Sequence, residues 1–158
     1  MDTRPIGVFD SGVGGLTVVK QIMKVMPNEN IVYFGDTARV PYGSHDRETV
    51  IEFARQDLKF LLGHDVKAVL VACGTVSATA LGELRQMTDL PVIGVVGAAA
   101  REAVSVSSNG RIAVLATGTS IKSHAYSKEI GKIAPEAVVS EQACPLFVPL
   151  VENGYVER

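Results

Sequence analysis

Cys73 is the residue of this sequence whose type and position most clearly suggest chemistry. It follows the apolar run at residues 69–72 and is itself followed by Gly74 and Thr75. This pattern predicts a buried strand that ends in a turn and a helix start. A thiol at a helix N-terminus is surrounded by backbone N–H groups, which can lower its pKa from about 8.5 toward neutrality. We therefore predict that Cys73 accepts or returns a proton near pH 7.

Small polar residues also follow the other predicted strands. The carboxyl ends of parallel strands meet at one edge of a sheet, and ligands of open parallel sheets bind there. We expect these residues to converge at such an edge. Carboxylate, hydroxyl, thiol and backbone N–H groups suit a small charged ligand that bears carboxylates. The residues concerned are Asp10, Ser11, Asp36, Tyr42, Gly43, Cys73, Gly74, Thr75, Thr117 and Thr119.

Each of these residues also has a purely structural explanation. Asp10 and Ser11 can cap the next helix, and a free cysteine such as Cys73 is often a small core residue. Tyr42 can be an ordinary loop aromatic, and Cys144 is expected to be structural. The three histidines have no partners at the spacing of a metal site or a catalytic triad. Convergence at one sheet edge is what favours the functional interpretation.

Alternating helices and strands are expected to position these groups. Strands separated by single helices, apolar on both faces, predict an α/β fold with a parallel sheet flanked by helices. Asp46 or Ser44 is expected to cap the second helix, and Gly63 to end it. A domain boundary is expected near residues 95–97. The predicted strands are residues 6–9, 31–34, 68–72, 91–95, 111–116 and 137–139, and the helices 16–26, 47–62, 77–87, 98–106 and 120–133.

Composition limits the class of protein. The chain has 158 residues, 47% hydrophobic and 20% charged, with a net charge of −2. This balance, without a basic stripe, predicts no binding to nucleic acid. The longest apolar run is far shorter than the roughly 20 residues that span a bilayer, and the first residues do not resemble a secretory signal. Two distant cysteines predict neither a disulfide framework nor a metal cluster, which suits a cytoplasmic protein.

A partial dinucleotide-binding fingerprint offers a second interpretation. Gly12 and Gly14 follow the first predicted strand, and Asp36 ends the second one about 20 residues later. The third position of the fingerprint is Thr17, where glycine or alanine is needed for close helix packing. Because no lysine stands in a Schiff-base context either, we predict no nicotinamide, flavin, pyridoxal phosphate or metal cofactor.

Five segments carry a more specific signal: IGVFDSGVGGLTV, YFGDTARVPYG, VACGTVSA, KSHAY and ACPLFVPLVE. They resemble the corresponding segments of glutamate racemases in the aspartate/glutamate racemase family, and the resemblance covers nearly all of the chain. It implies a cofactor-independent isomerase that interconverts L- and D-glutamate and supplies D-glutamate for peptidoglycan synthesis. It further implies two similar α/β domains with the active site between them, a cytoplasmic location and a homodimer.

The resemblance also implies roles for individual residues. Two cysteines would act on opposite faces of the substrate Cα, one removing a proton and the other delivering one. Cys73 matches the first of them, and Asp10 matches a residue that assists proton transfer. Positions that contact the substrate or hold its polar groups are matched by Asp10, Ser11, Tyr42, Gly43, Gly74, Thr75, Thr117 and Thr119.

Three departures from the family pattern shape the expectations for this chain. Gly74 stands where the family usually has asparagine, and GVVGAAA stands where it usually has Glu-Pro-Gly. The second family cysteine belongs to a Gly-Cys-Thr-His motif, which Cys144 does not match. We therefore expect an amino-terminal portion of a racemase that is inactive alone. Residues 1–96 would form a first α/β domain without its C-terminal return segment, and residues 97–158 part of a second.

A non-catalytic, racemase-like protein with a weak site for acidic amino acids is the alternative function. It would keep the polar groups at the sheet edge without carrying out the inversion, because inversion needs an acid and a base on opposite faces of Cα.

Overall fold

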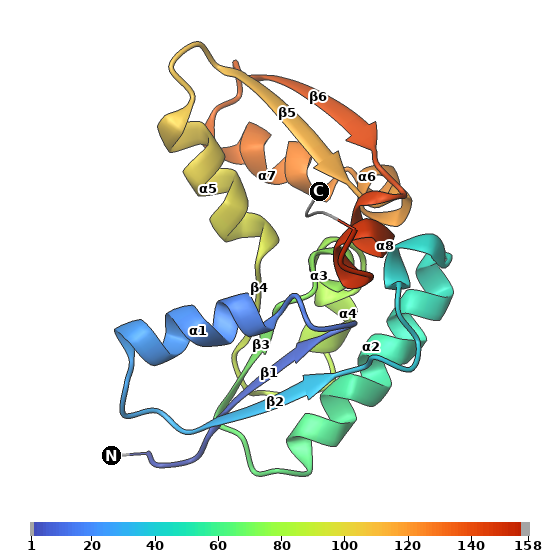
Figure 1. The fold of residues 1–158 in the computed structure, drawn as a ribbon. Helices are drawn as coiled ribbons and strands as arrows, with labels where there is room; N and C mark the ends of the chain where they lie inside the picture. The colour runs from blue at the N-terminus through green and yellow to red at the C-terminus, as the bar shows by residue number, and fades with distance from the viewer. Residues whose placement is uncertain (1, 156–158) are drawn as a thin grey trace.

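Two parallel sheets organise the chain in the computed structural model, which describes residues 2–155 (Figure 1). The first sheet has the strand order β2-β1-β3-β4, and the second pairs β5 with β6. Every pair is parallel. The parallel α/β fold predicted from the sequence is thereby confirmed. The strands are β1 (Ile6–Asp10), β2 (Ile31–Gly35), β3 (Ala68–Val71), β4 (Val92–Gly94), β5 (Arg111–Ala116) and β6 (Val138–Ala143).

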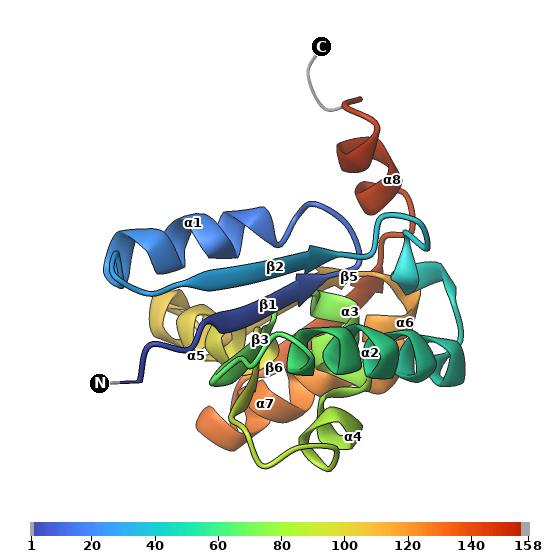
Figure 2. The ribbon, with the colours of Figure 1, turned by 90° about the horizontal axis from the view of Figure 1, so that it is seen from below.

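Helices connect successive strands, as expected for βαβ units. Figure 2 shows α1 and α2 on opposite faces of the first sheet, while α5 and α7 pack against each other beside the second. The helices are α1 (Leu16–Val25), the 3₁₀ turn η1 (Tyr42–Ser44), α2 (Arg47–Leu62), α3 (Gly74–Thr79), α4 (Leu81–Arg85), α5 (Val96–Val106), α6 (Gly118–Ser123), α7 (Ala125–Ile133) and α8 (Phe147–Glu152).

Helix α2 follows its sequence pattern closely. The Asp46 carboxylate accepts a hydrogen bond of 2.8 Å from the N–H of Thr49, so Asp46 is the N-cap, and the helix gives way to Gly63. Its apolar face, formed by Val50, Ala54, Leu58 and Leu61, is fully buried against the first sheet. The second core is smaller, with Ala100, Val114 and Ile130 at its centre.

Two predicted helices are each divided in two. The helix predicted at residues 77–87 is α3 followed by α4, and α3 begins earlier, at Gly74. The helix predicted at residues 120–133 is broken at His124, whose φ of 53° lies in the left-handed region. Because the spacing of the apolar residues continues across both breaks, that spacing could not predict them.

The end of the chain contains more regular structure than the sequence predicted. Strand β6 reaches Ala143, because it pairs with β5 along its full length. Residues 147–152 form α8, with Pro149 in the first turn, where a missing N–H leaves no intrahelical hydrogen bond unmade. Within residues 2–155, no helix is both long and apolar enough to cross a bilayer. The division into residues 1–96 and 97–158 stays a prediction, and α5 crosses it.

Candidate functional site

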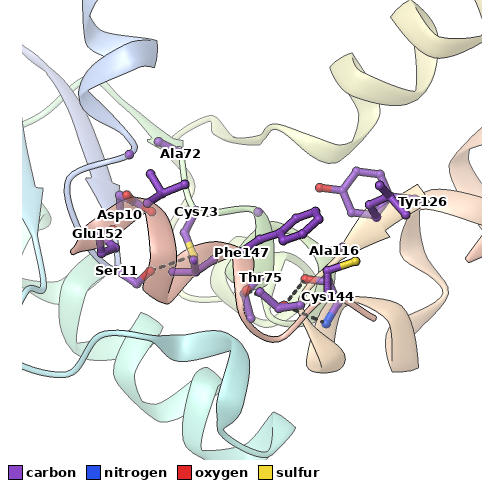
Figure 3. A pocket seen from close by; sticks show the side chains of 17 residues that line it. Asp10, Ser11, Ala72, Cys73, Thr75, Ala116, Tyr126, Cys144, Phe147 and Glu152 are labelled. Carbon is purple, nitrogen blue, oxygen red and sulfur yellow. Dashed lines mark hydrogen bonds between the residues drawn. The ribbon is translucent and has the colours of Figure 1, made fainter. Parts of the chain in front are cut away.

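A pocket of about 400 Å³ lies where the carboxyl ends of β1, β3 and β5 face one another (Figure 3). Helix α8 closes one side of it, and Tyr126 of α7 contributes another part of the wall. Six of the residues predicted from the sequence line the pocket together. They are Asp10, Ser11, Cys73, Gly74, Thr75 and Thr117.

Asp10 has both of the roles considered for it, because it holds the start of α1 and lines the pocket. Its Oδ2 accepts a 2.8 Å hydrogen bond from the N–H of Gly15, directly before α1, so the carboxylate does hold the helix start. The same buried carboxylate lines the pocket. A Cβ atom at Gly15 would lie 2.7 Å from the Cβ of Asp10, so glycine is needed for this close approach.

Cys73 is the N-cap residue of α3 and is only 4% exposed. Its thiol donates to the Ser11 hydroxyl, with an Sγ–Oγ distance of 3.5 Å. Burial raises the pKa of the Cys73 thiol, and the nearby Asp10 carboxylate raises it further. Ser11 and the N–H of Val76 oppose this shift but do not reverse it.

The predicted lowering of the Cys73 pKa is therefore wrong. The sequence correctly placed the thiol at a helix start, but burial disfavours the thiolate more than the N–H groups of a short helix favour it. The Cys73 thiol is therefore harder to ionise than an ordinary thiol.

Hydroxyl groups join the two sheets across the pocket. Thr75 Oγ1 lies 3.0 Å from Thr117 Oγ1, which in turn lies 2.9 Å from the hydroxyl of Ser120. Thr117 is also the N-cap of α6, since its side chain accepts from the N–H of Ser120. The Thr75–Thr117 contact thus links the helix that follows β3 to the end of β5.

Three predicted site residues lie behind the pocket wall instead of in it. Thr119 Oγ1 lies within hydrogen-bond distance of the carbonyl oxygens of Gly43 (3.1 Å) and His45 (2.6 Å). Tyr42 is 1% exposed, and its hydroxyl contacts the buried carboxylates of Asp36 and Asp57. Tyr42, Gly43 and Thr119 thus form a contact between the two sheets, directly next to Thr117.

Glu152 is the main lining residue that the sequence reasoning did not single out. It lies at the end of α8, and its carboxylate packs against Gly12, where a Cβ atom would overlap it. With Asp10 it places two carboxylates in one pocket. The pKa of Tyr33 is raised to about 12, mainly by burial and further by the charges of Asp10, Glu152 and Cys73. The signal was available, because Glu152 ends the segment ACPLFVPLVE.

Cys144 also lines the pocket, which the sequence did not predict. It follows β6, and its thiol faces the carbonyl oxygen of Gln142 at 3.8 Å. Figure 3 shows Cys144 beside Ala116, across the pocket from Asp10 and Ser11. The pocket therefore holds two thiols in different surroundings.

The dinucleotide interpretation does not fit the structure. The Asp36 carboxylate is buried and paired with Arg39 and Tyr42, so it is not available to a ribose. Within residues 2–155, no group of three or more His, Cys, Asp or Glu side chains is arranged to hold a metal ion. The side chains that line the pocket offer thiols, carboxylates and hydroxyls. Carboxylates favour an ammonium group, and N–H and hydroxyl groups favour a carboxylate.

Comparison with known proteins shows which proteins this chain is similar to. The sequence profile of the Asp/Glu/Hydantoin racemase family matches residues 11–156. A glutamate racemase from Neisseria gonorrhoeae is 50% identical over 156 residues, which are 98% of this chain and 58% of the relative. One from Geobacter metallireducens is 50% identical over 158 residues, 100% of this chain and 58% of the relative. The chain thus spans about 58% of the length of these curated relatives.

A solved structure shares the fold closely. The glutamate racemase from Francisella tularensis in complex with D-glutamate superposes with a TM-score of 0.93 at 44% sequence identity. The superposition covers 100% of this chain and 59% of that one.

Proposed function

Because the chain belongs to the Asp/Glu/Hydantoin racemase family, we propose that its pocket binds glutamate and serves the interconversion of L- and D-glutamate. The observation that carries the proposal is the placement of Cys73 beside Ser11 and Asp10 in a pocket that also holds Glu152. The volume of about 400 Å³ suits a small ligand.

The proposed chemistry assigns a task to each group in the pocket. Asp10 and Glu152 are two carboxylates that favour the substrate ammonium group. Thr75, Thr117 and the N–H groups at the start of α3 favour its carboxylates. Cys73, as thiolate, would remove or return the proton at Cα, with Asp10 assisting that transfer. The inversion also needs a second acid on the opposite face of Cα.

Several finer assignments belong to the same proposal. The D-glutamate formed would serve peptidoglycan synthesis, in the cytoplasm, and the working enzyme would be a homodimer. Their support is the similarity to glutamate racemases. No cofactor is part of the proposal, since thiol acid–base chemistry requires none. The pocket-lining residues, as far as the structure describes them, include no lysine for a Schiff base.

Selective alkylation of Cys73 tests whether the pocket binds glutamate. In wild type, iodoacetamide is expected to modify the more exposed Cys144 first, because Cys73 is buried and its pKa is raised. In Cys144→Ser, slow labelling of Cys73 should accelerate with pH and slow further when L- or D-glutamate is added. Peptide mass spectrometry measures both rates. Labelling of Cys73 that glutamate leaves unchanged would contradict glutamate binding in this pocket.

A non-catalytic protein that binds acidic amino acids is the second candidate function. Two observations favour it: the raised pKa of the Cys73 thiol, and Gly74 in the place of an asparagine side chain. Such a protein would show protection by glutamate but no exchange at Cα.

Restoring a side-chain amide should strengthen glutamate binding. A Cβ atom at Gly74 would lie 3.4 Å from the Tyr126 hydroxyl, which is ordinary van der Waals contact, so the Cβ of Gly74→Asn meets no clash. One added hydrogen bond to a charged group contributes about 1.5–3 kcal/mol, which corresponds to roughly tenfold or more in Kd. Calorimetric titration with glutamate measures the change. Gly74→Ala is the control, and an equal affinity of both variants would mean that the amide makes no contact.

A further inference from the structure

A buried polar cluster behind the pocket has no part in the chemistry proposed above. It consists of Asp36, which follows β2, Arg39 and Tyr42 in the next loop, and Asp57 in the middle of α2. Asp57 and Tyr42 are each 1% exposed, and Asp36 is 6% exposed. Two carboxylates buried against one guanidinium are costly unless their charges and hydrogen bonds are balanced.

The hydrogen bonds converge on the Tyr42 hydroxyl. It lies 2.9 Å from Asp57 Oδ2 and also contacts Asp36 Oδ2. Arg39 donates from Nε to Asp36 Oδ2 at 2.5 Å and from Nη2 to Asp57 Oδ1 at 3.2 Å. The hydroxyl oxygen of Tyr42 therefore lies between one carboxylate oxygen of Asp36 and one of Asp57.

The two contacts of the Tyr42 hydroxyl need two protons, and the hydroxyl supplies only one. A tyrosine hydroxyl has one proton and can donate to only one of the two carboxylates. If both carboxylates were ionised, the other oxygen pair would be in contact with no proton between them. A proton on Asp57 resolves this, because its carboxyl can donate to Tyr42, which then donates to Asp36.

Asp57 is the better of the two positions for this proton. Its side chain is fully buried, whereas Asp36 accepts the shorter contact from Arg39. Burial raises the pKa of Asp57 to about 7, and the charge of Asp36 adds to the effect, against the opposing influence of Tyr42 and Arg39. Near neutral pH, a small change in pH thus alters the protonation of a side chain in the core.

Tyr42 connects this cluster to the contact between the two sheets. It begins the turn η1, and its carbonyl oxygen accepts from the N–H of His45 at 3.0 Å. On the other side of the turn, Thr119 Oγ1 lies within hydrogen-bond distance of the carbonyl oxygens of Gly43 and His45, and Gly43 packs against Thr117. Movement of Tyr42 would therefore displace the surface on which the start of α6 rests.

We propose that Asp57 retains a proton in the folded protein and, through Tyr42, holds the turn at residues 42–45 against the start of α6. Asp57 is thus a positioning residue for the wall of the pocket, and loss of its proton loosens the contact between the two sheets. The proposal concerns the protein without ligand, so it stands whether or not the pocket binds glutamate.

Other titratable groups near α2 are engaged elsewhere. Helix α2 packs against β1, β2, α3 and α4. Within residues 2–155, α3 has no titratable side chain, and none of the groups on the other three elements bonds to Asp57. On β1, Asp10 is bound to the N–H of Gly15, and on β2, Tyr33 is bound to the carbonyl oxygen of Gly12. On α4, Glu83 is paired with Arg47, and Arg85 donates to the carbonyl oxygen of Val92.

The pH dependence of unfolding tests the retained proton. The folded pKa of Asp57 is raised above its unfolded value of 3.8, so this group destabilises the folded chain increasingly as pH rises from about 4 to about 7. Asp57→Asn keeps the size of the neutral acid but cannot titrate. We expect the unfolding constant of wild type, relative to this variant, to rise up to about tenfold per pH unit in that window and to level off above it.

Urea unfolding at a series of pH values provides these constants. Asp89→Asn is the matched control, because Asp89 is an exposed carboxylate on the loop after α4. Its unfolding constant should change with pH in the same way as that of wild type. If the unfolding constant of Asp57→Asn also changes with pH as that of wild type does, Asp57 is ionised in the folded protein and the proposal is wrong. Should Asp57→Asn fail to fold, Asp36→Asn replaces it. Removing the Asp36 charge lowers the Asp57 pKa, so the pH window should narrow.

Hydrogen exchange tests whether the proton holds the turn. Above pH 7, exchange of the amides in residues 42–46, corrected for its intrinsic pH dependence, should accelerate in wild type but not in Asp57→Asn. Tyr42→Phe removes the link and should show fast exchange at every pH. Exchange in wild type that does not change across pH 7 would overturn the positioning role, even if Asp57 titrates as expected.

Discussion

Cys73→Ser is expected to lower exchange of the glutamate Cα hydrogen with solvent by about 10²–10⁴-fold, the range typical of losing a positioned acid or base. The expectation rests on the placement of the thiol, which contacts Ser11 and lies close enough to Asp10 for that charge to raise its pKa. A serine hydroxyl keeps the size and the hydrogen bond but is not ionised near neutral pH.

The raised pKa of Cys73 sets the pH profile of this exchange. Only the thiolate can remove a proton, and below the thiol pKa its population rises about tenfold per pH unit. Because burial and Asp10 raise that pKa, exchange should be slow at pH 7 and accelerate toward alkaline pH. A bound ammonium group would offset part of the shift, since it introduces a positive charge beside Asp10 and the thiol.

Incubation of residues 1–158 with L- or D-glutamate in D₂O measures both exchange and inversion. Deuterium at Cα, followed by mass spectrometry, should appear without loss of optical rotation, because Cys73 acts on one face of Cα. Inversion should stay 10²–10⁴-fold below the rate of a full-length glutamate racemase. Cys144→Ser is the control. If inversion ran at ordinary enzyme speed and this variant lost it, Cys144 would be the second acid and the one-face interpretation would be wrong.

The sequence contained most of the fold because the fold depends on local patterns. The apolar face of α2 was predicted correctly, and its cap, Asp46, is one of the two residues expected there; both features are local to one helix. The parallel pairing of β5 and β6 followed from the alternation of strands and helices. The break at His124 was not predictable in the same way, because a left-handed residue inside an apolar periodicity leaves the periodicity unchanged.

The candidate site was predictable in its position but not in its electrostatics. Asp10, Cys73 and Thr117 come from three strand ends, and the topology of a parallel sheet brings such ends together. The pKa of Cys73 depends instead on how deeply the thiol is buried and on its proximity to Asp10. Both are properties of the tertiary packing, so the local helix-start argument gave the wrong sign.

The segment YFGDTARVPYG shows a second limit of sequence reasoning. Asp36, Tyr42 and Gly43 of this segment were expected at the same edge of the sheet, but in the structure they make different contacts. Tyr42 and Asp36 belong to a buried cluster, and Gly43 belongs to the contact with α6. Residues that are neighbours in a sequence motif can face different parts of the structure. The direction of each side chain follows from the fold and cannot be read from the motif.

Gly43→Ala should weaken glutamate binding roughly 5–150-fold, because a Cβ atom at Gly43 overlaps the side chain of Thr117. Overpacking of this kind costs about 1–3 kcal/mol. Neither the turn at Gly43 nor the side chain of Thr117 can move away easily. Tyr42 is fixed in the core, and Thr117 is bonded to Thr75 across the pocket.

The strain at Gly43 should therefore be relieved by separation of β5 from β3, which pulls Thr117 out of the pocket wall. Calorimetric titration with glutamate, together with urea unfolding, measures the two consequences. Gly118→Ala is the matched control, since Gly118 directly follows Thr117 but a Cβ atom there would meet nothing within 4 Å. If Gly43→Ala bound glutamate as tightly as Gly118→Ala, the pocket would not depend on the close approach of the turn to α6, and the contact would be structural alone.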